Sequence, residues 1–103
     1  MRIIYHVKAG ADSGLNLVLM QAWEIYRKKG AVFADPHVVM REDDGGGAIR
    51  LVEIFTWTSS DIPDHAPKEI TDIWAREQAL CEGRNGRPAI EDGEVDLVVP
   101  AQK

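Results

Sequence analysis

The chain has 103 residues, of which 45% are hydrophobic and 28% are charged, and these values are typical of one folded domain with one core. With 12 basic and 17 acidic side chains its formal net charge is −5, which argues against binding to nucleic acid or to anionic membranes. The single cysteine excludes an internal disulfide framework, and neither a signal peptide nor a membrane span is recognisable, so we expect a cytoplasmic protein.

A strand is predicted over residues 2–9, because apolar side chains alternate along it. Its two faces carry different side chains, Ile3, Tyr5 and Val7 on one and Ile4 and His6 on the other. Residues 10–14 are expected to form a turn, in which Asp12 or Ser13 caps the helix that follows.

A helix is predicted over residues 15–29, where apolar side chains recur at spacings of three and four residues. Three basic residues end this segment, beside the negative end of the helix dipole. Gly30 then accepts the left-handed conformation that commonly follows the last helical turn. The apolar stripe of this helix is expected to face the core.

Two strands joined by a hairpin are predicted next. Residues 31–42 form the first, and Pro36, which has no N–H, places it near a sheet edge or at a bulge. The glycine-rich residues 43–47 form the connection. Residues 49–57, IRLVEIFTW, are the longest run of strand-forming side chains, with Ile49, Leu51, Glu53, Phe55 and Trp57 on one face. Both faces carry apolar residues, so we expect packing on each side.

A second helix is predicted after residues 58–65, with Asp64 as its cap and Pro67 in its first turn. Its core positions recur at helical spacing, and they are Ile70, Ile73, Trp74, Glu77, Leu80 and Cys81. Glycine and proline mark residues 82–94 as loop or extended chain. A short last strand is predicted over residues 95–99, before Pro100.

This order of elements predicts an α+β fold of the ferredoxin-like βαββαβ type, as one domain over residues 1–103. Right-handed crossovers place both helices on one face of a four-stranded antiparallel sheet and leave the other face open. That open face is expected to carry apolar side chains, namely Ile4, Phe33, Val39, Leu51, Phe55 and, at its end, Trp57. We expect a second copy of the chain to bury this patch in a homodimer.

The element order, the strand IRLVEIFTW running into TSSDIPDHAPKEITDIW, and the closing VDLVV resemble the antibiotic biosynthesis monooxygenase family. The resemblance covers essentially the whole chain. It implies a dimeric α/β barrel, in which two ferredoxin-like subunits pack sheet against sheet. It also implies a small cofactor-independent monooxygenase that acts on an aromatic or polycyclic substrate in a barrel cavity.

His6 is the first candidate catalytic residue. Because it shares a face with Ile4, it is expected to project into a cavity between the sheet and the partner subunit. There its imidazole would move a proton near neutral pH. The structural alternative is a core histidine that is hydrogen-bonded to the backbone or to a neighbouring carboxylate.

His37 and Glu53 join His6 as candidate catalytic residues, provided that their strands present them to the open face. A carboxylate held against an imidazole fixes its tautomer and raises its basicity. The structural alternative is a buried pair that fixes the strand register. Two histidines and one carboxylate also match non-haem iron sites, but the spacing carries no metal signature, so no metal is expected.

Four residues are candidates for substrate binding, and they are Trp57, Phe55, Leu51 and His65. Trp57 is expected either to wall an aromatic pocket or to close the core beside the second helix. His65 precedes the second helix, where it either lines the cavity mouth or serves as a surface or capping residue. The chain has no dinucleotide or phosphate-binding motif, so no cofactor is expected.

Two alternatives to the oxygenase remain open. Cofactor-free members of the family use an inward-pointing asparagine, whereas this chain has asparagine only at Asn16, in a helix start, and Asn85, in a loop. This difference favours a non-catalytic dimeric module that binds a small aromatic or apolar ligand or serves as a scaffold. The other alternative is a haem-binding protein, since some members of the family bind and degrade haem.

Overall fold

The structure, a computed structural model, describes residues 1–96. Its strands and helices follow the predicted order. They are β1 (Arg2–Val7), α1 (Asp12–Lys28), β2 (Val38–Gly45), β3 (Ala48–Ile54), α2 (Lys68–Ala79) and β4 (Ile90–Gly93). The predicted α+β class is therefore confirmed.

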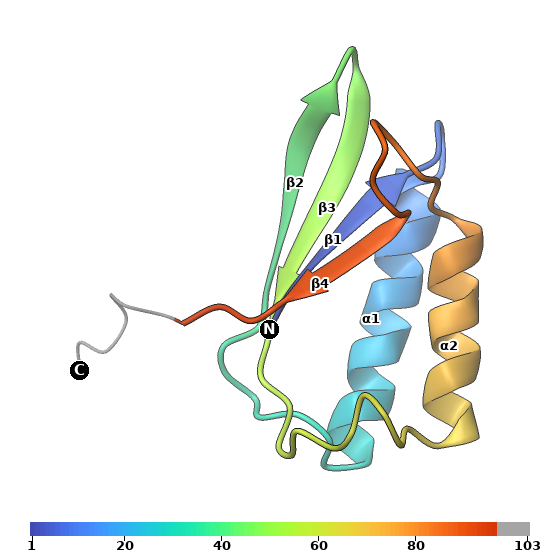
Figure 1. Cartoon of the computed structure of the whole chain (residues 1–103). Coiled ribbons are helices and arrows are strands. Elements are labelled where there is room, and N and C mark those ends of the chain that lie inside the picture. Colours follow the sequence, from blue (N-terminus) through green and yellow to red (C-terminus); the bar gives the residue numbers. More distant parts are fainter. Residues whose placement is uncertain (97–103) are drawn as a thin grey trace.

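The sheet has four antiparallel strands in the order β2-β3-β1-β4, so β1 and β3 form its centre. Figure 1 shows α1 and α2 side by side against one face of this sheet, and no helix within residues 1–96 covers the other face. Right-handed crossovers account for this, because they carry both helices to the same side. The arrangement is compatible with a ferredoxin-like fold.

β2 begins at Val38, later than the predicted start at residue 31. Pro36 lies in the preceding loop, in accord with its inability to donate a ladder hydrogen bond. Between residue 31 and β2, only Val32 pairs in a strand-like manner, through an isolated bridge to Trp57. The predicted edge position of β2 is confirmed, and the irregularity in its pairing lies near the hairpin rather than at the proline.

β4 lies earlier in the chain than predicted. Residues 90–93, which were expected in a loop or extended segment, pair with residues 2–5 of β1. Of the strand predicted over residues 95–99, residues 95 and 96 are in no regular element, and residues 97–99 lie outside the described part of the chain. The sequence of β4, IEDG, has one apolar side chain, so it lacks the alternation by which strands are recognised.

Both helices begin without a side-chain cap. α1 already includes Asp12, whose charge favours the positive end of the helix dipole from within the first turn. α2 begins after Pro67, so Asp64 does not cap it. Gly30 has a φ of 67°, as predicted for the residue that follows the first helix. Neither helix is long and apolar enough to cross a membrane, as far as residues 1–96 show.

The core fills the space between the two helices and the sheet as two neighbouring clusters of buried side chains. Phe55 is the most buried member of the first cluster, where it packs with Tyr26 of α1 and Ile73 of α2. The second cluster packs Tyr5 of β1 against Leu15 of α1 and other neighbours. One face of the sheet therefore carries both clusters.

The prediction of which face of β3 lies open is wrong, although the side chains were grouped correctly. In an antiparallel pair, directly opposed residues place their side chains on the same face. Leu51 lies opposite Tyr5 and Glu53 lies opposite Ile3, so both face the helices, and Phe55 joins them in the core. Because both faces of β3 carry apolar side chains, the alternation did not distinguish them.

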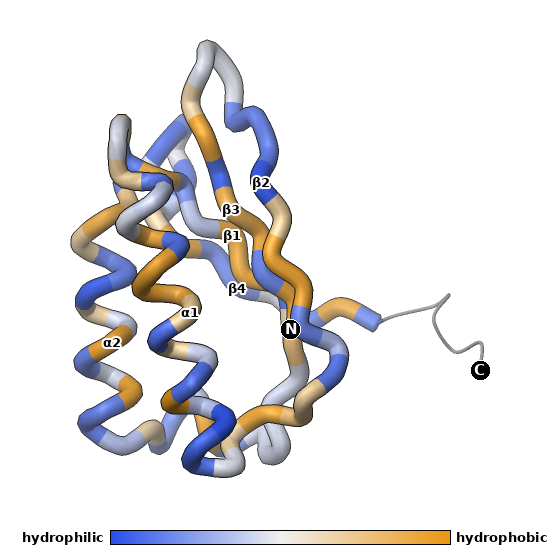
Figure 2. Tube along the Cα trace, turned by 180° about the vertical axis from the view of Figure 1, so that it is seen from behind, coloured by the Kyte–Doolittle hydropathy of each residue, from blue (hydrophilic) through white to orange (hydrophobic). Residues whose placement is uncertain are grey.

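The open face of the sheet therefore carries a different set of side chains from the one predicted, with Ile4 common to both. By register it presents Ile4 and His6 of β1, Arg50, Val52 and Ile54 of β3, and Val38, Met40 and Glu42 of β2. Val38 and Met40 are 43% and 39% exposed, respectively. Figure 2 shows that β2 is apolar in its first half and hydrophilic toward the hairpin. Phe33 and Trp57 lie outside the strands, and Val39 lies opposite Glu53 on the helix side.

Candidate functional site

A pocket of about 390 Å³ opens between α2, the segment that follows β3, and the part of the sheet formed by the central strand β1 and the edge strand β4. Its aromatic and apolar lining includes Ile3, Tyr5, Trp57, Trp74 and Ile90. A few polar side chains complete the wall, among them Glu77, Asp64 and Asp92. Apolar concave surfaces with few polar groups are the usual form of small-molecule sites.

The spacing of side chains along α2 brings Trp74 and Glu77 to this pocket. Ile70, Ile73 and Glu77 form the buried stripe of the helix, at intervals of three and four residues. Trp74 precedes Glu77 by three residues, so the two side chains are neighbours on the helix surface. The same turn of α2 thus provides one aromatic and one acidic side chain to the pocket wall.

Trp57 is held in place by its backbone and by its aromatic neighbours. Its backbone pairs with Val32. The centroid of its ring lies 4.8 Å from that of Phe55 and 6.2 Å from that of Trp74, and both ring pairs are edge to face. Such geometries are the favoured ones for aromatic pairs. Trp57 packs against the core, which is one of the two positions considered from the sequence, and it also lines this pocket, which lies on the helix side of the sheet and not in the expected barrel cavity.

Two buried polar atoms of the pocket-lining residues, Trp57 Nε1 and Glu77 Oε2, have no hydrogen-bond partner within residues 1–96. Glu77 is only 3% exposed. Buried polar groups are nearly always paired, and leaving one unpaired costs about 1–3 kcal/mol. Both atoms therefore belong to residues of the pocket wall and lack the partner that a buried polar group needs.

Burial raises the pKa of Glu77 to about 8, and the charge of Glu53 adds to the shift. At pH 7 the carboxyl group is therefore mostly protonated, and in this form it is a hydrogen-bond donor. It loses its proton as the pH passes through about 8. A buried carboxyl with this pKa can give or take a proton near neutral pH, as general acid–base catalysis requires.

His37 and Glu53 form the imidazole–carboxylate contact that was considered from the sequence, with 2.9 Å between His37 Nε2 and Glu53 Oε2. The other carboxylate oxygen of Glu53 accepts a hydrogen bond of 2.7 Å from the Tyr5 hydroxyl. His37 also stacks on Trp23 of α1, with ring centroids 3.6 Å apart. Burial and the charges of Glu53 and Glu77 raise the pKa of Tyr5, so its hydroxyl stays protonated and continues to donate to Glu53.

His37 and Glu53 do not share a face of the sheet with His6, which corrects the arrangement considered from the sequence. Glu53 points toward the helices, whereas His6 points to the open face. His37 lies ahead of β2 and reaches Glu53 from the helix side, where it also contacts Trp23. The three residues therefore do not form one constellation.

His6 is buried on the open face between two carboxylates. Its Nδ1 lies 2.6 Å from Asp44 Oδ2, and its Nε2 lies 2.5 Å from Glu91 Oε2. Burial would lower the pKa of His6, but the hydrogen bonds and charges of the two carboxylates outweigh this effect and raise it. A carboxylate at each nitrogen favours the doubly protonated ring, which has no site left to accept a proton. This geometry matches the structural alternative for His6, a core histidine that is hydrogen-bonded to neighbouring carboxylates.

The other predicted substrate-binding residues lie outside the pocket lining. Phe55 is buried in the core behind Trp57. Leu51 is a core residue that also borders a separate hollow between α1 and β2. His65 is exposed in the segment before α2. None of the three histidines of the chain is among the described residues that line the pocket.

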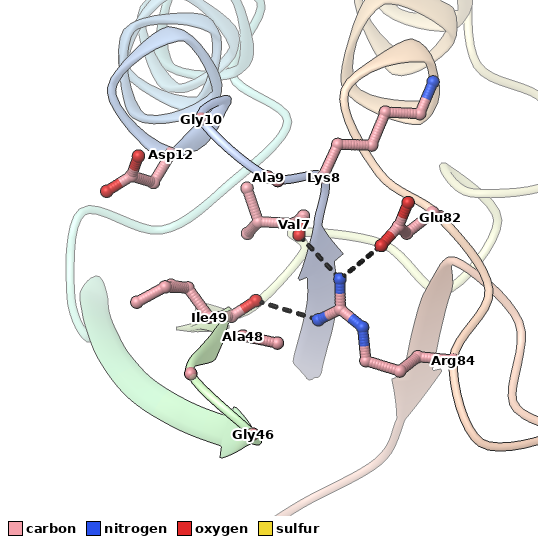
Figure 3. Close-up of a pocket in the computed structure, with 11 residues that line it drawn as sticks. Val7, Lys8, Ala9, Gly10, Asp12, Gly46, Ala48, Ile49, Glu82 and Arg84 are labelled. Carbon is pink, nitrogen blue, oxygen red and sulfur yellow. Dashed lines mark hydrogen bonds and ion pairs between the residues drawn. The ribbon is translucent and has the colours of Figure 1, made fainter.

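A second hollow, of about 380 Å³, lies between the start of α1, the β2–β3 hairpin and the segment after α2. Figure 3 shows Arg84 reaching across it to the carbonyl oxygens of Val7 and Ile49 and to the carboxylate of Glu82. Arg84 also donates to Asp44 at 2.7 Å. Because these groups already bind the guanidinium, it joins β1 to β3 and does not offer a free cation to a ligand.

Glu77, Trp74 and Tyr5 were not among the predicted site residues, because each was assigned to the core. The sequence did contain one signal for Glu77, since it occupies a position where the spacing from Ile70 and Ile73 calls for an apolar side chain. Trp74 and Tyr5 are ordinary core residue types and carried no such signal. No group of three or more metal-ligating side chains occurs within the described residues 1–96.

Comparisons with known proteins add no assignment to this site. No family model matches the chain, and neither the search of curated proteins nor that of solved structures found a match. The resemblance to the antibiotic biosynthesis monooxygenase family therefore stays an expectation. The function has to be inferred from the pocket.

Proposed function

We propose that the chain binds a small aromatic or apolar molecule in the pocket between α2 and the sheet. The observation that carries the proposal is the aromatic wall formed by Tyr5, Trp57 and Trp74. Flat rings pack favourably against such side chains, with about 0.5–1.5 kcal/mol per aromatic pair beyond the burial of area. The volume of about 390 Å³ also lies within the roughly 300–1,000 Å³ of small-molecule sites.

Calorimetric titration with a naphthalene derivative tests this proposal. The wild-type protein is expected to bind the probe, and Trp74→Ala to bind it at least about tenfold more weakly, because an aromatic contact and its buried area are lost. Trp23→Phe is the matched control, since Trp23 stacks on His37 and does not line the pocket. Equal affinity in wild type and Trp74→Ala would place the probe elsewhere and contradict the proposal.

The second candidate function is that of a cofactor-independent oxygenase acting on a phenol-like aromatic substrate, and the raised pKa of Glu77 favours it. In this reaction the ionised Glu77 takes the proton of the substrate, and a ring carbon of the resulting anion forms a bond to dioxygen. Loss of water from the hydroperoxide then leaves a quinone, so one oxygen atom enters the product, the other leaves as water, and the substrate supplies the electrons. Glu77 replaces His6 as the base, because His6 lies on the opposite face with both nitrogens bound.

Dioxygen uptake on addition of a polycyclic phenol measures this activity. Uptake is expected to fall at least about 10²-fold in Glu77→Gln, which keeps the shape of the side chain but cannot accept the proton. Trp23→Phe again serves as the control and is expected to keep the wild-type rate. Uptake that is equal in wild type and Glu77→Gln would remove the assignment of Glu77 as the base.

We further propose that two chains associate through the open face of the sheet. Val38 and Met40 leave an apolar band of this face in contact with solvent. Arg50 and Glu42 lie on the same face and pair with each other at 2.7 Å, so burying this face leaves neither charge without a partner. Two sheets packed in this way make the dimeric α/β barrel that the resemblance implies. Each subunit keeps its own pocket, since the pocket lies on the helix side.

A further inference from the structure

We infer that the pocket selects aromatic ligands that carry hydrogen-bond acceptor oxygens, such as an aryl ketone, and binds these oxygens with the Glu77 carboxyl and the Trp57 indole N–H. The inference rests on the proposed binding function and adds the polar part of the recognition. The aromatic wall accepts any flat ring of suitable size. The two donors distinguish an oxygenated ring from a hydrocarbon.

The indole of Trp57 specifies an acceptor. An indole N–H is a donor only, so no other kind of ligand atom can satisfy it. Its Nε1 is buried and has no partner within residues 1–96. Trp74, the other indole of the pocket, is different, because its Nε1 already donates to the Tyr26 hydroxyl at 2.6 Å. Of the two indoles that line the pocket, Trp57 is therefore the one whose N–H no described residue satisfies.

Glu77 provides the second donor from the α2 side of the pocket. Its buried carboxyl is neutral at pH 7, and its Oε2 has no partner among the described residues. Asp64 and Asp92 line the same pocket and add negative charge to it. The site is therefore expected to prefer a neutral carbonyl compound over a carboxylate of the same shape.

The affinity for such a ligand is expected to depend on the protonation of Glu77. The titratable and charged groups that face Glu77 come from every neighbouring element, and they are Tyr5 on β1, Tyr26 on α1, Glu53 on β3, Cys81 after α2, and Asp64 and Asp92 in the pocket wall. Burial raises the pKa of both tyrosines, and it raises the pKa of Cys81 to about 11. These three groups therefore keep their protons between pH 6 and 9, whereas Glu77 loses its proton in this range.

Two probes of the same shape test the inference by calorimetry. 2-Acetonaphthone carries a carbonyl oxygen where 2-isopropenylnaphthalene carries a CH₂ group. At pH 6.5 the ketone is expected to bind roughly tenfold more tightly, since hydrogen bonds between neutral groups contribute roughly two- to tenfold each. Equal affinities would overturn the inference and leave the binding function in place. If neither probe binds, the proposed function itself fails.

Two variants separate the donors. Trp57→Phe keeps an aromatic ring but has no N–H, so the ketone is expected to lose roughly two- to tenfold in affinity while the hydrocarbon loses little. Glu77→Gln keeps a donor that does not titrate, so its affinity for the ketone is expected to stay constant between pH 6 and 9. The wild-type affinity for the ketone is expected to fall as the pH rises through about 8. An equally constant wild-type affinity would overturn the role of Glu77.

An NMR measurement on the wild-type protein covers the case in which Trp57→Phe does not fold. The indole N–H resonance of Trp57 is expected to move downfield when the ketone is added, because the proton enters a hydrogen bond. The hydrocarbon is expected to leave the resonance without this downfield shift. The same response to both probes would contradict the assignment of Trp57 as a donor to the ligand.

Discussion

At the scale of single residues, Glu77 links the stability of the protein to pH. Its pKa of about 8 in the folded protein lies above the ordinary value of 4.5, so between these values the folded state binds more protons than the unfolded state. The free energy of unfolding therefore decreases as the pH rises through this range. One such group contributes a decrease of about 1.4 kcal/mol per pH unit.

Glu77→Gln is expected to remove this contribution, because an amide does not titrate. The stability of the variant relative to wild type should rise steadily from pH 5 to pH 8, by up to about 1.4 kcal/mol per unit. Urea unfolding of both proteins over this range measures the difference. Glu24→Gln, at an exposed position of α1, provides the control. Parallel stability curves for wild type and Glu77→Gln would show that the buried carboxyl is not held neutral.

At the scale of elements, the ion pairs of His6 join three strands. His6 belongs to β1, and its carboxylate partners Asp44 and Glu91 belong to β2 and β4. β4 is only four residues long, so this contact supplements a short ladder of backbone hydrogen bonds. The buried histidine thus has a structural role in the sheet, and the chemistry of the pocket does not need it.

Gly14 lies inside α1, and Gly30 follows the C-terminal end of this helix. Substitution by alanine is expected to change the stability in opposite directions at these two positions. Gly30 has a φ of 67°, so Gly30→Ala is expected to lower the stability by about 1 kcal/mol. Gly14 lies inside the helix, and an added methyl would meet Leu80 at an ordinary contact distance of 4.0 Å. Gly14→Ala is therefore expected to raise the stability by about 0.4–1 kcal/mol. Thermal unfolding measures both changes, and the same sign for both would contradict the assigned backbone conformations.

At the scale of the whole molecule, the two faces of the sheet have different structural roles. The helix-covered face carries both core clusters and one wall of the pocket. The open face carries Val38, Met40 and other apolar side chains beside charged residues. Exposed apolar patches with a polar rim are typical of interaction surfaces, which is why we propose that a second copy binds there.

Analytical ultracentrifugation tests the proposed dimer. The wild-type chain is expected to sediment as a dimer at micromolar concentration, and Met40→Glu as a monomer, because a charge would then enter the apolar interface. Met20→Glu is the matched control, since Met20 is 60% exposed on α1, away from the open face. A monomeric wild type would exclude the dimer and the barrel. The pocket would remain, because one chain forms all of it.

Much of the fold was predictable because it depends on local patterns. The spacing of apolar residues indicated α1, and the glycine at position 30 indicated its end. Pro36 indicated that β2 lies at an edge, since proline cannot take part in a central ladder. β4 was misplaced because its sequence has too few apolar residues to alternate.

The site was less predictable, because it depends on contacts between segments that are distant in the sequence. Alternation showed which side chains of β3 share a face, but the packing of α1 and α2 decided that Glu53 faces the core. The pKa of Glu77 is raised because α2 buries it near Glu53 of β3, and no local pattern contains this proximity. The sequence alone therefore determined the class and order of the elements, through periodicities that act within a few residues. The tertiary structure decided which carboxyl group is buried beside an aromatic pocket, because desolvation and charge act through space.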